Sequence, residues 1–304
     1  MFRRSLALLA AAAVLVTLLV SSSQAARPSG DFPITVIAAN GKVAIPRKPR
    51  RIVSLSPSAT ESLFAIRAGA QVVAVDDQSD YPEAAPRTRL SGFTPNAEAV
   101  AKYRPDLVIV SYDANSIVAS LKKLHVPVMV QAAPRTLPQA YEQIKQLGRA
   151  TGHLDRARTV IARMRTQTAR LVAASTTRAR GVSLYHELSP DYYSATSSTF
   201  IGSVYRLFGL RNIADAADSS GSGYPKLAGE YVIASDPGLI VLADVKCCGQ
   251  TKGTVSGRPG WDRIRAVRNG AVVLLDDSIA SRWGPRVVNF VRAVSSALRT
   301  SVRS

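Results

Sequence analysis

Aromatic and polar side chains gather in loops that follow the expected strands, and their types suit the binding of a ligand. Aromatic rings can stack on a flat ligand, while Gln, Arg and His side chains supply hydrogen bonds. Open α/β sheets bind ligands at the carboxyl ends of their strands. The expected ligand-binding residues are Gln78, Phe93, Tyr112, His186, Tyr192, Tyr193, Tyr224, Arg282 and Trp283.

The sequence carries none of the common catalytic motifs. It has no G-x-S-x-G elbow, no P-loop, no H-E-x-x-H and no G-x-G-x-x-G after an expected strand. The chain has only three histidines, and its two cysteines, Cys247 and Cys248, are adjacent, which disfavours a multi-His or four-thiolate metal centre. His186 alone could ligate a metal, but a hydrogen-bonded aromatic wall is the favoured interpretation. We expect no catalytic residue, no resident metal and no cofactor.

A repeated segment places one glutamate in each half of the chain. Residues 98–110 and 230–242 share a Glu, six residues, a Pro, one further residue and four apolar residues. Each copy predicts a short helix, a turn imposed by the Pro, and a buried strand. A favourable position at a helix N-terminus would explain a single Glu. The matched pair, Glu98 and Glu230, favours equivalent surfaces on two lobes.

The strands expected to position these residues are short and continuously apolar. Continuous apolar runs are typical of strands buried on both faces, as in parallel sheets covered by helices. Asn40-Gly41 between two such runs predicts a hairpin. The other expected strands are residues 51–55, 71–75, 106–110, 126–130, 182–185, 239–242 and 271–275.

Helical patterns separate these runs. Residues 58–68 open with Ser58-x-x-Glu61, the spacing of a capping box, and further helices are expected at 116–124 and 285–299. Residues 138–178 predict one long connecting helix, with Gly152 as its candidate break. The expected fold is α/β: two Rossmann-like lobes, 31–137 and 179–304, are joined by this single helix.

The beginning of the chain indicates export. Arg3 and Arg4 precede an apolar run at 5–20, and Ser23-Gln24-Ala25 resembles a small-x-small cleavage site. We expect residues 1–25 to be a signal peptide, and an uncleaved membrane anchor is the alternative.

The composition excludes a disordered chain, because 46% of the residues are hydrophobic and only 20% are charged. The formal net charge of +18 would favour binding to a nucleic acid or to an anionic surface. However, the basic residues are spread through both halves rather than clustered with aromatic residues. We therefore expect no nucleic-acid partner.

Several motifs, in order and spacing, resemble the vitamin B12 and ferric-siderophore substrate-binding proteins of ABC importers. The resemblance covers about residues 34–300. It implies two α/β lobes bridged by one rigid helix, a ligand in the cleft between them, and a monomer that performs no reaction. The motifs are residues 51–61, 79–82, 96–98 with 105–109, and Arg282 with residues 284–286.

The resemblance also assigns roles to single residues. Glu98 and Glu230 match the two acidic residues, one per lobe, that dock on arginine pockets of the permease. Tyr224 stands where the B12 binders have a corrin-contacting Trp, and Arg282 matches an arginine that reaches the corrin side chains. His186 falls at an aromatic contact. The chain departs from that pattern at Gln78, which replaces a Tyr, at Gly92, which replaces a Trp, and at Ser278, which replaces an Asp.

The expected function is that of an extracytoplasmic solute-binding protein. It captures a metal chelate, either a ferric siderophore or a cobalamin-type ligand, and delivers it to an ABC permease. One alternative is an exported α/β enzyme acting on a small molecule through His186 and Glu187, and another is a basic adhesin on an anionic wall. Cys247 and Cys248 form either a vicinal disulfide at the cleft rim or two free thiols.

Overall fold

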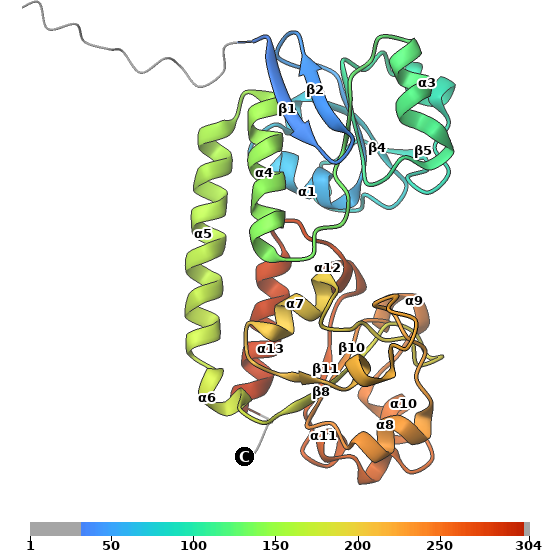
Figure 1. Ribbon diagram of the computed structural model, residues 1–304, viewed down its shortest axis with the longest axis vertical. Coiled ribbons are helices and arrows are strands. Elements are labelled where there is room, and N and C mark those ends of the chain that lie inside the picture. The colour runs from blue at the N-terminus through green and yellow to red at the C-terminus, as the bar shows by residue number, and fades with distance from the viewer. Residues whose placement is uncertain (1–31, 301–304) are drawn as a thin grey trace, which may run out of the picture.

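Two parallel sheets, one in each lobe, carry the loops that matter for function (Figure 1). The computed structural model describes residues 32–300 of the 304-residue chain. The expected signal peptide at 1–25 lies outside the described residues. No helix in the described part of the chain is both long and apolar enough to cross a membrane.

The N-terminal lobe is built on a five-stranded parallel sheet of order β5-β4-β3-β6-β7. All four residues of β3 and of β6 are buried, as their continuous apolar runs predict. The strand β5 was not expected, because its sequence, Arg-Thr-Arg-Leu, exposes two arginines at the edge of the sheet. The strands are β3 (Ile52–Leu55), β4 (Val72–Asp76), β5 (Arg87–Leu90), β6 (Leu107–Val110) and β7 (Val128–Val130).

A hairpin of β1 (Ile34–Ala38) and β2 (Gly41–Ile45) precedes this sheet. Gly41 has a φ of +94°, which a glycine adopts without strain. Asn40 fastens the hairpin to β7, because its side-chain amide donates to the Val128 carbonyl and accepts from the Val130 N–H. The hairpin prediction at Asn40-Gly41 is confirmed.

The C-terminal lobe has a four-stranded parallel sheet of order β11-β10-β8-β9. Its central strands are buried throughout. The two-residue strand β9 was too short to show in the sequence pattern. The strands are β8 (Ser183–Glu187), β9 (Arg211–Asn212), β10 (Leu239–Leu242) and β11 (Val272–Leu274).

The helices cover both sheets and join the lobes. In the N-terminal lobe they are α1 (Pro57–Ala65), α2 (Ala97–Ala101), α3 (Ile117–Lys123) and α4 (Leu137–Thr151). The joining and C-terminal helices are α5 (Leu154–Ala173), α6 (Thr176–Ala179), α7 (Phe200–Arg206), α8 (Gly229–Ser235), α9 (Val245–Cys248), α10 (Lys252–Ser256), α11 (Arg265–Arg268), α12 (Asp277–Ser281) and α13 (Val287–Thr300). Short 3₁₀ turns occupy Gly69–Gln71, Ala114–Ser116, Ile213–Ala217 and Trp261–Arg263.

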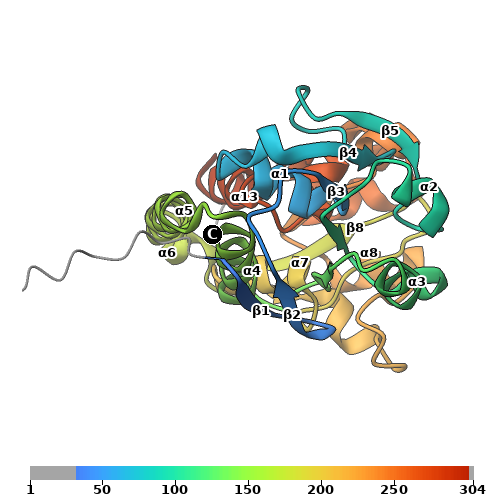
Figure 2. The ribbon, with the colours of Figure 1, turned by 90° about the horizontal axis from the view of Figure 1, so that it is seen from above.

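Residues 138–178 differ from the single helix that we expected. Gly152, with a φ of +73°, ends α4, and α5 runs back beside it (Figures 1 and 2). The two helices approach closely at Gly148, where a Cβ atom would lie 2.5 Å from the Cβ of Ala157. The α4 helix therefore belongs to the N-terminal lobe, and only α5 extends from α4 to α13 of the other lobe.

The beginning of α1 also differs from the expectation. Ser56, not Ser58, caps the helix, because its side chain accepts from the Ala59 N–H. Pro57 then occupies the first turn. The Glu61 side chain is therefore free of any capping role and contacts the C-terminal lobe instead.

Candidate functional site

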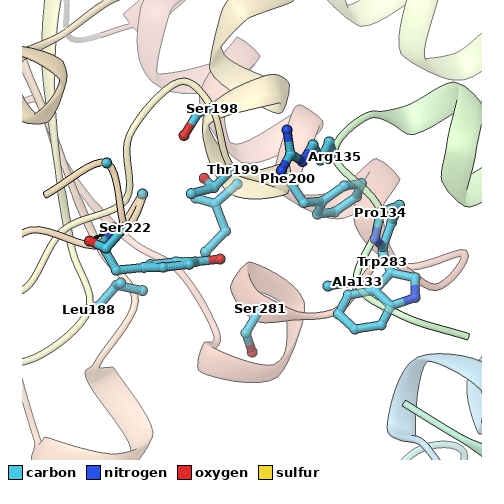
Figure 3. Close-up of a pocket in the computed structure, with 14 residues that line it drawn as sticks. Ala133, Pro134, Arg135, Leu188, Ser198, Thr199, Phe200, Ser222, Ser281 and Trp283 are labelled. Carbon is cyan, nitrogen blue, oxygen red and sulfur yellow. Dashed lines mark hydrogen bonds between the residues drawn. The ribbon is translucent and has the colours of Figure 1, made fainter. Parts of the chain in front are cut away.

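A pocket of about 450 Å³ lies where residues 133–135, between β7 and α4, meet loops of the C-terminal lobe (Figure 3). This volume is within the usual range for small-molecule sites. Figure 3 shows Ala133, Pro134 and Trp283 on one side of the hollow and Leu188 and Ser222 on the other. The pocket is therefore built from both lobes.

The wall of the pocket is mainly apolar and aromatic. Phe200 and Trp283 meet edge to face, with ring centroids 6.4 Å apart. Phe200 is placed by the start of α7, where the Thr199 hydroxyl accepts from the Gly202 N–H. Only glycine fits at position 202, because a Cβ atom would lie 2.0 Å from the Thr196 carbonyl oxygen. The close turn at 196–202 thus aims the first residue of α7 at Trp283.

A loop fixed by Asp218 presents Tyr224 to the same pocket. The Asp218 carboxylate accepts from the backbone N–H groups of Ser222 and Gly223. Burial alone would raise the pKa of Asp218, but these and neighbouring hydrogen bonds outweigh it and lower the pKa. Burial raises the pKa of the Tyr224 hydroxyl, which stays neutral. Tyr224 therefore offers a ring face and a hydroxyl group to a ligand.

Of the predicted ligand-binding residues, Tyr224 and Trp283 line this pocket. Gln78, Phe93, Tyr112 and Tyr193 are exposed on other loops and do not line it. Their roles stay predictions. Sequence reasoning missed residues 133–135 and Phe200. Two sequence features could have indicated these residues: a Pro in the loop before α4, and Thr199, which caps the start of α7.

Arg282 does not point a free guanidinium into the pocket. It forms an ion pair of 2.5 Å with Asp80 and donates to the Gln78 carbonyl oxygen at 2.7 Å. Burial would raise the pKa of Asp80, but Arg282 outweighs it and holds that pKa below its usual value. Arg282 therefore joins the two lobes, and its role as a ligand contact stays a prediction.

A second, buried ion pair lies beside that contact. The Glu61 side chain, only 1% exposed, accepts from Arg286 at 2.6 Å. The guanidinium of Arg286 also stacks over the ring of Tyr81, 4.2 Å from its centroid. A Cβ atom on Gly284 would lie 2.7 Å from a carboxylate oxygen of Glu61, so glycine leaves room for this pair. Two ion pairs thus hold the lobes together, and Arg282 of one of them lies between the pocket residues Ser281 and Trp283.

His186 lies in the interior of the C-terminal lobe, which corrects its prediction as a ligand contact. Its side chain is fully buried, with Nδ1 at 2.6 Å from the Tyr205 hydroxyl and the ring beside Phe290. Burial lowers the pKa of His186 to about 3, so the imidazole is neutral. It offers no exposed face to a ligand, a metal or a substrate.

Glu187 is equally unavailable to a substrate. Its carboxylate is fully buried, forms a two-point ion pair with Arg258 at 2.6 and 2.7 Å, and accepts from the Tyr185 hydroxyl at 3.1 Å. Burial, reinforced by the charge of Glu187, raises the pKa of neighbouring Asp244 to about 7. A catalytic role for His186 and Glu187 therefore has no geometric support in the described structure.

Tyr192 belongs to this buried cluster rather than to the pocket. Its ring stacks on Trp261, with centroids 5.7 Å apart, and Arg258 lies over both rings. These contacts shield the Glu187–Arg258 ion pair from water. Tyr192 does not line the pocket, and its role as a ligand contact stays a prediction.

The comparison with known proteins decides the family. A model of the family described as periplasmic binding protein matches residues 52–279. The chain belongs to the periplasmic binding protein family. Its members are transport proteins and not enzymes. The predicted family resemblance, the α/β fold class and the absence of an enzymatic function are confirmed.

Relatives of this periplasmic binding protein match along most of its length. It is 28% identical over 286 residues to an uncharacterized ABC transporter substrate-binding lipoprotein of Bacillus subtilis, covering 91% of this chain and 88% of the relative. It is 28% identical over 281 residues to a cobalamin-binding protein of Halobacterium salinarum, covering 89% and 75%.

Two solved structures share its fold. A periplasmic haem-binding protein of Roseiflexus superposes with a TM-score of 0.72 at 24% identity, covering 84% of this chain and 100% of that one. A periplasmic vitamin B12-binding protein of Vibrio cholerae superposes with a TM-score of 0.69 at 23% identity, covering 84% and 99%.

Glu98 and Glu230 occupy equivalent places in the two lobes of this periplasmic binding protein. Each lies in the first turn of its helix, α2 or α8, and each side chain is exposed. Within residues 32–300, neither carboxylate has an ion-pair or hydrogen-bond partner. Both helices lie on the side of the molecule away from α5 (Figure 2). The pair is therefore free to contact another protein.

Cys247 and Cys248 are joined as a vicinal disulfide in α9. Both are exposed and follow the carboxyl end of β10. The Asp277 carboxylate accepts from the N–H groups of Lys246 and Cys247, which fixes the start of α9. The disulfide thus forms a stiff exposed turn at the end of the sheet that faces the other lobe.

Proposed function

We propose that this protein captures a metal chelate, a ferric siderophore or a cobalamin-type ligand, and delivers it as a monomer to an ABC permease. The observation that carries the proposal is the aromatic pocket between the lobes of a periplasmic binding protein. Phe200, Tyr224 and Trp283 offer ring faces suited to a large flat chelate. A pocket already formed by both lobes lowers the ordering cost of binding.

The names of similar proteins support this class of ligand. One relative is a cobalamin-binding protein, and structures with the same fold bind haem or vitamin B12. The high net positive charge of the chain does not decide which ligand binds, because only one of the described residues that line the pocket is charged.

Tryptophan fluorescence tests the proposal directly. The chain has two tryptophans, Trp283 in the pocket and Trp261 buried in the C-terminal lobe. We expect a bound chelate to quench mainly Trp283. The purified protein is titrated with cyanocobalamin, haemin, ferrichrome and ferric enterobactin, and the same titrations follow on Trp283→Phe and Trp261→Phe.

The two variants separate binding in the pocket from binding elsewhere. Quenching that survives in Trp261→Phe but is lost in Trp283→Phe supports the proposal. Failure of all four chelates to bind at micromolar concentration, measured also by calorimetry, contradicts the proposed function.

A further inference from the structure

Arg135 is the single charged residue among the fourteen described residues that line the inter-lobe pocket. It lies in the loop that leads from β7 to α4. Its backbone N–H donates to the side chain of Gln139 at 2.6 Å, and the N–H of Gln139 donates to the Thr136 hydroxyl. The backbone is therefore fixed, and Figure 3 shows the side chain beside Phe200.

The guanidinium group of Arg135 is free to bind a ligand. The residue is exposed, and within residues 32–300 its side chain has neither an ion pair nor a hydrogen bond. Arg282, the arginine that the sequence suggested for this task, is occupied by Asp80 and the Gln78 carbonyl. The free positive charge at the pocket is thus that of Arg135.

Most neutral polar groups of the pocket are already engaged. The hydroxyl of Ser281 donates to the Asp277 carbonyl at 2.6 Å, and that of Thr199 donates to the Thr196 carbonyl at 2.8 Å. The Ser222 hydroxyl donates to Asp218. A ligand therefore meets an apolar wall with few free donors, and no acidic residue is among the described lining residues.

We propose that Arg135 selects an anionic ligand, a metal chelate that carries a carboxylate at its rim. The apolar body of the chelate lies against Trp283, Phe200 and Tyr224, while the carboxylate receives two hydrogen bonds from the guanidinium. This inference rests on the proposed function, because it names the class of chelate that the same pocket takes.

Three pairs of chelates, matched except for carboxylate charge, test the inference. They are haemin and its dimethyl ester, a cyanocobalamin monocarboxylic acid and cyanocobalamin, and ferrichrome A and its trimethyl ester. For each class that binds, we expect the acid to bind about tenfold or more tightly than its neutral partner, and Arg135→Gln to remove this preference. Arg135→Lys should restore part of it. The preference should also shrink as salt is raised.

Arg163→Gln is the matched control, because Arg163 is an exposed residue of α5 that does not line the pocket. It removes the same unit of charge and should leave the preference unchanged. Equal affinity of acid and neutral chelates for the wild-type protein, or a preference that persists in Arg135→Gln, overturns the inference and leaves the proposed function standing. Absence of binding by all six chelates contradicts the proposed function itself, and the inference with it.

Discussion

Asp244 and Glu187 are two buried carboxyl groups beside one arginine, Arg258. Glu187 holds the arginine in a two-point ion pair, and within residues 32–300 Asp244 has no ion pair of its own, although the charge of Arg258 still acts on it. A second negative charge at that depth is unfavourable, so Asp244 retains its proton up to about pH 7. A protonated Asp244 can donate to the Glu187 carboxylate, which makes the group neutral overall.

This arrangement predicts a pH-dependent stability that Asp244→Asn removes. The pKa of Asp244 is about 7 in the folded chain and near 3.8 when unfolded, so the folded chain binds the extra proton between these values. The free energy of unfolding therefore falls as pH rises through that window. Because asparagine donates to Glu187 without ionising, the variant should match the wild type near pH 4 and exceed it at pH 8.

Urea unfolding of both proteins at several pH values measures the difference. Only the difference between the two profiles is informative, because Asp76, with a pKa raised by burial to about 6, and His186, with a pKa lowered to about 3, also titrate. Parallel profiles would show that Asp244 does not carry the proton.

Single-residue roles were harder to predict than the elements that hold them. Tyr224 and Trp283 could be placed at the pocket because aromatic residues in loops after strands suit a ligand site. His186 has the same sequence signature, but strand β8 turns it into the core, where Tyr205 satisfies its Nδ1. Alternation along a strand decides which side chain faces a ligand, and a strand buried on both faces gives no such alternation.

At the level of elements, the sequence predicted what depends on local pattern. The continuous apolar runs gave β6 and β10 at their observed places, because a strand buried on both faces needs them. Helical periodicity at 138–178 predicted helix correctly on both sides of Gly152, but periodicity carries no information on the direction of the second helix. The left-handed conformation of Gly152 ends α4, and the chain turns back through His153 into α5.

The close packing of α4 on α5 makes Gly148 sensitive to a single methyl group. A Cβ atom there would lie 2.5 Å from that of Ala157 and 3.2 Å from the His153 carbonyl oxygen. We expect Gly148→Ala to lower the free energy of unfolding by about 1–3 kcal/mol, because the two helices must separate. Gly253→Ala in α10 is the control, since its Cβ meets only ordinary contact with Thr251. Equal stability of Gly148→Ala and the wild type in urea would contradict this packing.

For the whole molecule, the decisive contacts join residues far apart in the sequence. Arg282 reaches Asp80 and Glu61, which are 202 and 221 positions away. The family resemblance indicated two lobes and a cleft. Local sequence patterns cannot show that Arg282 forms ion pairs between the lobes. For the same reason, the sequence does not show which arginine lacks an ion-pair partner, and Arg135 was therefore not among the expected ligand-binding residues.

Glu98 and Glu230 lie on different lobes, so their predicted role in docking depends on the arrangement of the whole molecule. Each exposed charge contributes little to affinity, but two contacts, one on each lobe, fix the orientation of a partner. We expect the double reversal Glu98→Lys with Glu230→Lys to abolish uptake of a bound chelate in cells. The chelate's dissociation constant should not change, because neither residue lines the pocket.

The control reverses two acids on the helices α4 and α5, namely Glu142 of α4 and Asp155 of α5. It changes the net charge by the same amount, so a loss of uptake common to both double variants would indicate a general charge effect and not docking. If only the Glu98 and Glu230 reversal blocks uptake, each single reversal should retain part of it, since one lobe can still engage. Normal uptake by the double variant would exclude these glutamates as the permease contact.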